Sequence, residues 1–167
     1  KHIITVQTEH KCVLDSCRYL EQEGFEVTYL PVKQNGLIDL DTLRDAIRED
    51  TALVSVMAVN NEVGSCNDIA EVASVVRAHA PNAWLHTDAV QAACWVDLSE
   101  LTQHVDLLSL SAHKFGGPKG VGIMVVSNGV TPEPLVRGGG QERGRRSGTI
   151  DVAGTVGTAT ALHITGS

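Results

Sequence analysis

Residues 52–58 read ALVSVMA, an apolar run from Ala52 to Ala58 that is broken only by Ser55. A strand with one face in water would alternate apolar and polar residues, whereas this run is apolar on both faces. Such a pattern is typical of a strand buried inside a parallel sheet, with helices covering both sides. The stretch therefore predicts a layered α/β fold.

The segments on either side of this run alternate between strand-like and helix-like patterns. Strands are predicted over residues 2–7, 25–30, 52–58, 84–87, 105–109 and 120–126. Apolar residues at helical spacing predict helices over residues 9–22, 68–80 and 152–162, and a short helix that Asp41 caps. This alternation favours one α/β domain with a mostly parallel central sheet flanked by helices.

Composition excludes several classes of protein. The chain has 167 residues, a net charge of −7 and 43% hydrophobic residues, as expected of a globular domain that buries its own core. The acidic balance argues against a nucleic-acid partner, and the sequence holds no apolar run long enough for a membrane span. The start of the chain resembles a strand and not a signal peptide, which together with the cysteines predicts a cytoplasmic protein.

The four cysteines are irregularly spaced, with no Cys-x-x-Cys pair. This spacing favours reduced thiols over a disulfide framework, and the histidines show no metal-ligand spacing, so no metal site is predicted. Cys12 and Cys17 are expected to face the packing side of the first helix.

Three polar clusters each follow a predicted buried strand. They are Asn60-Asn61-Glu62, Asp88-Ala89-Val90-Gln91 and Ser111-Ala112-His113-Lys114. In open α/β sheets, ligands bind outside the carboxyl ends of the strands. The clusters therefore predict one site at that edge, which His10 can join because it follows the first strand closely.

Lys114 is the most informative residue of these clusters. A lysine between a buried strand and a glycine-rich turn can be desolvated, which lowers its pKa and makes the neutral amine a nucleophile. Ser111 and His113 beside it, with the glycines that follow, supply the donors that a phosphate group needs. Taken alone, Lys114 would be read as an ordinary solvated loop lysine.

Asp88 is suited to a cofactor with a ring nitrogen. A carboxylate can hold a pyridinium nitrogen protonated, which keeps the ring an electron sink. Gln91 and Asn61 could donate hydrogen bonds to a ring hydroxyl, and His10 could stack on a flat heteroaromatic ring. Individually, these residues are also compatible with caps, loops and ordinary packing.

Five motifs occur along the chain in a fixed order. They are Thr8-Glu9-His10-Lys11, Val59-Asn60-Asn61-Glu62-Val63-Gly64, His86-Thr87-Asp88-Ala89-Val90-Gln91, Ser111-Ala112-His113-Lys114 and Gly138-Gly139-Gly140-Gln141-Glu142-Arg143. Together they resemble the cysteine desulfurases, within the class V aminotransferase group of pyridoxal-phosphate enzymes. The resemblance implies the large domain of a type I pyridoxal-phosphate-dependent transferase, incomplete at both ends. Residues 1–167 would be that cofactor-binding domain, without the small C-terminal domain.

The resemblance also implies roles for single residues. Lys114 would bond covalently to pyridoxal 5'-phosphate and later shuttle the α-proton of the substrate. Ser111 and His113 would bind the phosphate group, and Asp88 would pair with the pyridine nitrogen.

The remaining implied roles fall on four residues. Asn61 and Gln91 would contact the ring hydroxyl, and His10 would stack on the ring and assist proton transfer, which makes it catalytic together with Lys114. Thr149 matches a residue that reaches the phosphate bound by a partner subunit. The resemblance therefore implies a homodimer.

The implied reaction removes sulfur from L-cysteine, which gives alanine and an enzyme persulfide for iron–sulfur cluster or thio-cofactor synthesis. A sulfur-acceptor or scaffold protein would be the partner. The substrate-gripping arginine and the sulfur-accepting cysteine of the family have no counterpart here, so the 167-residue chain alone is predicted to be inactive. The alternatives are a selenocysteine lyase or another class V enzyme, a non-catalytic cofactor-binding fragment, and an α/β binding domain without the cofactor.

Overall fold

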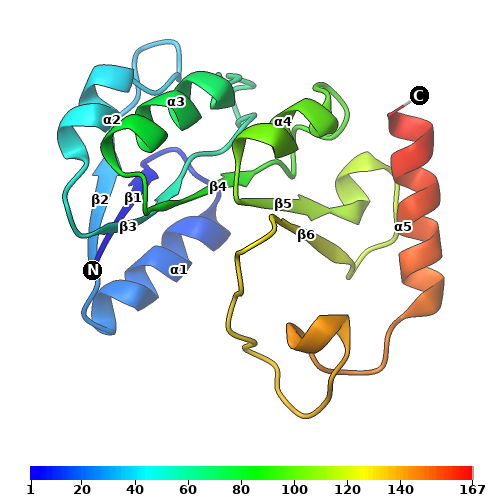
Figure 1. Ribbon diagram of the computed structural model, residues 1–167. Helices are drawn as coiled ribbons and strands as arrows, with labels where there is room; N and C mark the ends of the chain where they lie inside the picture. Colours follow the sequence, from blue (N-terminus) through cyan, green and yellow to red (C-terminus); the bar gives the residue numbers. More distant parts are fainter. Residues whose placement is uncertain (167) are drawn as a thin grey trace.

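The computed structural model describes residues 1–166, and Ser167, the last residue of the predicted domain, lies outside the described residues. The described chain forms a six-stranded sheet in the order β2-β1-β3-β4-β5-β6 (Figure 1). The strands are β1 His2–Val6, β2 Glu26–Leu30, β3 Thr51–Ser55, β4 Trp84–Asp88, β5 Leu107–Ser111 and β6 Gly122–Val126. Neighbouring strands from β2 to β5 pair in parallel, and β6 pairs antiparallel with β5.

Helices lie on both faces of the sheet. They are α1 Lys11–Gln22, α2 Leu40–Ala46, α3 Ile69–His79, α4 Leu98–His104 and α5 Val152–Thr165, with short 3-10 turns η1 Ala112–Phe115 and η2 Glu142–Gly144. In Figure 1, α1 lies on one face of the sheet, α2, α3 and α4 lie on the other, and α5 stands beside η1 at the β6 end. This three-layer arrangement is the one that the buried run of residues 52–58 predicted.

That run lies at the centre of the core. Val54 and Val56 have no exposed surface. The strand β3 ends at Ser55, but the N–H groups of Val56 and Ala58 still donate to the carbonyl oxygens of His86 and Asp88, at 3.1 and 3.0 Å. The extended backbone therefore continues beside β4 and carries the chain to the polar cluster at residue 60.

The helix α3 follows the spacing that predicted it. Its buried residues Ile69, Val72 and Val76 recur every three or four positions and pack into the same core as β3. Asp68 caps the helix, because its carboxylate accepts the N–H of Glu71 at 3.0 Å.

The cap of α2 differs from the prediction. Asp39, not Asp41, is the N-cap, since its carboxylate accepts the N–H of Thr42 at 2.9 Å. Asp41 lies in the first turn, where its carboxylate pairs with Arg44 at the surface. The cap is set by which carboxylate reaches a free N–H two or three residues ahead, and both aspartates satisfy the residue preference.

The boundaries around β5 also differ. The helix α4 was not predicted, because it is only seven residues long and brings just two half-buried leucines, Leu98 and Leu101, to the core. Val105 is buried, but it is the C-cap of α4, so the strand predicted at residues 105–109 begins later, at Leu107. The shift extends β5 to Ser111 and places that residue at the carboxyl end of the sheet.

Candidate active site

The structure holds a cavity of about 270 Å³ at the carboxyl ends of the parallel strands. Seven of the eight predicted cofactor-binding residues line it: His10, Asn61, Asp88, Gln91, Ser111, His113 and Lys114. They come from four separate stretches of the chain, which the parallel strands bring to one edge. Cys12, Met57 and Val90 also line the cavity and were not predicted to.

Lys114 lies on η1, directly after β5. Ala112 and Phe115 are buried and anchor this turn, which leaves His113 and Lys114 on its exposed side. The desolvation predicted for Lys114 is therefore wrong for the described chain. The hydroxyl oxygen of Ser111 lies 2.9 Å from Nδ1 of His113, so these two predicted phosphate ligands form one hydrogen-bonded pair.

Asp88 ends β4 with only 5% of its surface exposed. Its Oδ1 accepts the N–H of Val90 at 2.9 Å, which orients the carboxylate while the side chain lines the cavity. A largely buried carboxylate that still contacts the cavity is suited to pair with a cationic ring nitrogen. Gln91, three residues further along, lines the same wall.

Asn60 fixes the loop that presents Asn61. Its buried side-chain oxygen accepts the N–H groups of Glu62 and Val63, both at 2.9 Å, and its amide group donates to the carbonyl oxygen of Thr8 at 2.8 Å. The loop is thereby tied to the end of β1. Asn61 is exposed on it and lines the cavity.

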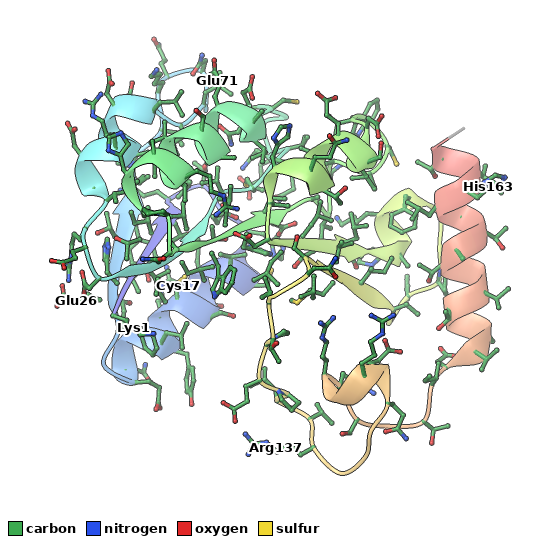
Figure 2. The ribbon with its side chains drawn as sticks, in the orientation of Figure 1. Lys1, Cys17, Glu26, Glu71, Arg137 and His163 are labelled. Atoms are coloured by element: carbon green, nitrogen blue, oxygen red, sulfur yellow. The ribbon has the colours of Figure 1, made fainter. Side chains whose placement is uncertain are left out.

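His10 is the N-cap of α1. Its Nδ1 lies 3.2 Å from the backbone nitrogen of Cys12 and 3.0 Å from the Cys12 sulfur. Cys17 is buried as predicted and lies on the sheet side of α1 in Figure 2. The same prediction is wrong for Cys12, which is exposed and faces the cavity because it belongs to the first turn of the helix, ahead of the packing interface.

Glu9 is a further residue to which the sequence analysis gave no role. It is 5% exposed, its Oε1 accepts the N–H of Met57 at 2.6 Å, and its Oε2 is buried without a hydrogen-bond partner in the described chain. Burial, together with the nearby charge of Asp88, raises the pKa of Glu9 to about 8. An acidic residue beside a histidine gives no sequence signal of burial, since acids are rarely buried.

Thr149 is the predicted site residue that does not join the cavity. It is exposed on the long connection between β6 and α5, the yellow and orange segment of Figure 1. Arg137 lies on the same connection, away from the sheet in Figure 2. Within residues 1–166, no group of three or more His, Cys, Asp or Glu side chains is placed to hold a metal ion. None of the described helices is both long and apolar enough to cross a membrane.

The family pattern described as Aminotransferase class-V matches residues 1–167. The chain belongs to the class-V aminotransferase family. It is 54% identical over 166 residues to a probable mitochondrial cysteine desulfurase of Schizosaccharomyces pombe, covering 98% of this chain and 33% of the relative. It is 47% identical over 163 residues to cysteine desulfurase IscS of Clostridium botulinum, covering 98% of this chain and 41% of the relative.

Solved structures agree with this family. A NifS-like protein matches with a TM-score of 0.96 and 47% identity, covering 99% of this chain and 45% of the other. SspA in complex with cysteine matches with a TM-score of 0.89 and 42% identity, covering 97% of this chain and 47% of the other. These matches confirm the predicted fold class. The chain spans between a third and a half of the length of these proteins.

Proposed function

We propose that this chain is the cofactor-binding part of a pyridoxal-phosphate-dependent cysteine desulfurase. The observation that carries the proposal is the gathering of seven predicted ligands around one cavity in a class-V aminotransferase fold. The names of the relatives support L-cysteine as the substrate, as does the cysteine complex of SspA.

The side chains that line the cavity fit pyridoxal phosphate chemically. They include one lysine amine for the aldehyde, a hydroxyl–imidazole pair for the phosphate, a carboxylate for the ring nitrogen and two amides for the ring hydroxyl. When bound, the cofactor supplies an electron sink that makes the α-proton of an amino acid labile.

Each of the predicted residues that line the cavity would have its own task toward the cofactor. Lys114 would hold the cofactor through its side-chain amine, and the same amine would take the α-proton of the substrate. Asp88 would keep a proton on the ring nitrogen, and the Val90 N–H holds the carboxylate in place for that task. Ser111 and His113 would bind the phosphate together, Asn61 and Gln91 would hold the ring through its hydroxyl, and His10 would contact the ring.

The overall reaction conserves sulfur and electrons. The sulfur of L-cysteine passes to a protein thiolate, which becomes a persulfide, and the carbon skeleton leaves as alanine. The thiolate is needed because a thiol is a poor nucleophile. A sulfur-acceptor or scaffold protein then takes the persulfide sulfur for iron–sulfur cluster or thio-cofactor synthesis.

Thr149 bears on how two copies of the protein associate. It is exposed and outside the cavity of its own chain. We assign it to the phosphate bound by a second copy, so the enzyme is a homodimer. Mitochondrial and bacterial proteins both occur among the relatives, so the cytoplasmic location stays a prediction.

The test is a visible absorption scan of the full-length protein with added pyridoxal phosphate. We expect a protein-dependent band that is absent from Lys114→Ala and retained by Lys119→Ala. Lys119 is the matched control, because it is an exposed lysine five residues away that does not line the cavity. A Lys114→Ala protein with the wild-type band would overturn the role of Lys114.

Product analysis separates the alternatives. A cysteine desulfurase releases alanine and forms a persulfide from L-cysteine, whereas a selenocysteine lyase prefers the selenium substrate. A band without turnover of either substrate in the full-length protein indicates another class V enzyme or a non-catalytic cofactor-binding protein, and assays with other amino acids separate these two. An absent band in the full-length protein identifies an α/β binding domain of another kind.

A further inference from the structure

The first turn of α1 brings a thiol and an imidazole together at the cavity wall. His10 has an extended backbone (φ −60°, ψ 148°) and caps the helix with its own ring. Its Nδ1 lies 3.2 Å from the Cys12 nitrogen and 3.0 Å from the Cys12 sulfur, and both residues line the cavity. The proposed function uses the ring of His10 and leaves Cys12 without a task.

The backbone contact decides which nitrogen of His10 carries the proton. An N–H group can only donate, so Nδ1 must offer a lone pair to the N–H of Cys12. A neutral imidazole has one protonated nitrogen, and that proton therefore lies on Nε2. A proton on Nδ1 would face the helix N-terminus and leave the Cys12 N–H without its acceptor.

The thiol contact supports the same tautomer. A neutral S–H can donate to the Nδ1 lone pair. A thiolate could only accept a hydrogen bond and would favour a proton on Nδ1. Partial desolvation of the sulfur raises the pKa of Cys12, as do the carboxyl groups of Asp88 from β4 and Glu9 from the β1–α1 connection. These effects outweigh the backbone N–H groups of Val13 and Cys12, which lower it. The other titratable groups that line the cavity are Lys114 and His113, both on η1. The sulfur therefore stays S–H at neutral pH.

We propose that Cys12 is a positioning residue whose N–H and S–H together hold His10 as the neutral ring protonated at Nε2. His10 then presents a hydrogen-bond donor to the cavity. The Nδ1 atom stays engaged with Cys12 at the first turn of α1. The catalytic meaning of this tautomer rests on the proposed function.

The tautomer is measured directly by ¹⁵N NMR of the full-length, cofactor-free protein with labelled histidine. The signals of His10 are assigned by their loss in His10→Gln. We expect the Nε2–H form in the wild type and in Cys12→Ser, whose hydroxyl can still donate. In Cys12→Ala the ratio of the Nε2–H to the Nδ1–H form falls by about fivefold, as loss of one ordinary hydrogen bond predicts. An Nδ1–H wild type, or a Cys12→Ala ratio equal to wild type, overturns the proposal.

Alkylation kinetics distinguish a thiol from a thiolate–imidazolium pair. Iodoacetamide modification is followed cysteine by cysteine with mass spectrometry, and the exposed Cys66 and Cys94 serve as internal references. We expect Cys12 to react several-fold more slowly than these two near pH 7 and to accelerate as the pH rises. Cys12 reacting fastest at about pH 6 would show an ion pair and would overturn the proposal.

Both measurements are made without cofactor, so they are independent of the proposed function. If the Lys114 band is absent while the tautomer and the alkylation order are as expected, the proposed function fails and the positioning role of Cys12 stands. If the band is present and the tautomer is Nδ1–H, the proposed function stands and the positioning role of Cys12 fails.

Discussion

At the scale of single residues, the carboxyl group of Glu9 lies buried between the end of β1 and the backbone of Met57. In the unfolded chain its pKa is about 4.5, and burial raises it to about 8 in the folded protein. The folded state therefore holds the proton more tightly than the unfolded state between these two values. The raised pKa of Glu9 therefore stabilises the folded state fully below about pH 4.5, and this stabilisation is lost as the pH rises through about 8.

This shift gives a prediction for Glu9→Gln. The amide oxygen of glutamine can accept the Met57 N–H without ever ionising, so the variant should lack this pH dependence. Each pKa unit is worth about 1.4 kcal/mol, so the variant should gain on the order of a few kcal/mol over wild type by ~pH 8.5. Denaturant unfolding of the full-length protein across this range measures the difference.

The matched control is Glu23→Gln, since Glu23 is an exposed glutamate beyond the end of α1. Its free energy of unfolding should stay within about 0.5 kcal/mol of wild type at every pH. Parallel pH curves for Glu9→Gln and wild type would contradict the assignment of a buried, protonated Glu9.

At the scale of elements, the 3-10 turn η1 places Lys114 and His113, and its shape depends on a close backbone approach. A Cβ added to Gly117 would lie 2.9 Å from both Cβ and the carbonyl oxygen of Ala112. Ala112 is fully buried and cannot move aside. The N–H of Gly117 also donates to the same carbonyl at 2.8 Å, so the turn closes through this contact.

We therefore expect Gly117→Ala to lower the free energy of unfolding by about 1–3 kcal/mol, as overpacking usually does. Because the turn carries Lys114, the visible band with pyridoxal phosphate should weaken as well. Denaturant unfolding and an absorption scan of the full-length protein test both effects. Gly140→Ala is the control, since a Cβ there meets nothing within 4 Å. Equal stability of the two variants would show that the turn tolerates a side chain.

At the scale of the whole molecule, α5 leaves several large apolar side chains exposed. It has no Asp, Glu, Lys or Arg, and its contacts with other described elements are chiefly with η1. Val152, Val156 and Ile164 are exposed on it. Contiguous apolar surface of this kind favours association in water.

We expect the 167-residue chain, expressed alone, to self-associate through this surface. Val156→Lys should reduce the apparent mass in sedimentation or light scattering. Thr155→Lys adds the same charge at an exposed polar position outside the row of Val152, Val156 and Ile164, and should change the association less. A monomeric wild-type chain would contradict the prediction.

The sequence by itself determined the buried strand, because residues 52–58 are apolar on both faces and only a covered parallel sheet accommodates that. It also determined the site in outline, since polar clusters after parallel strands must meet at one edge. The five motifs that resemble the family are short runs of neighbouring residues in a fixed order, so they can be read from the sequence without the fold. For this reason seven of the eight residues predicted from the sequence line one cavity, while their roles stay predictions.

The tertiary structure alone decided the state of three side chains in and around that site. Glu9 became a buried acid, Cys12 turned to the cavity, and Lys114 stayed exposed on its turn. Burial, and with it the pKa of Glu9 and of Cys12, depends on atoms brought from distant strands, such as Met57 and Asp88. Residue spacing fixes which groups share an edge, but desolvation and charge act through distances that only the packed chain sets.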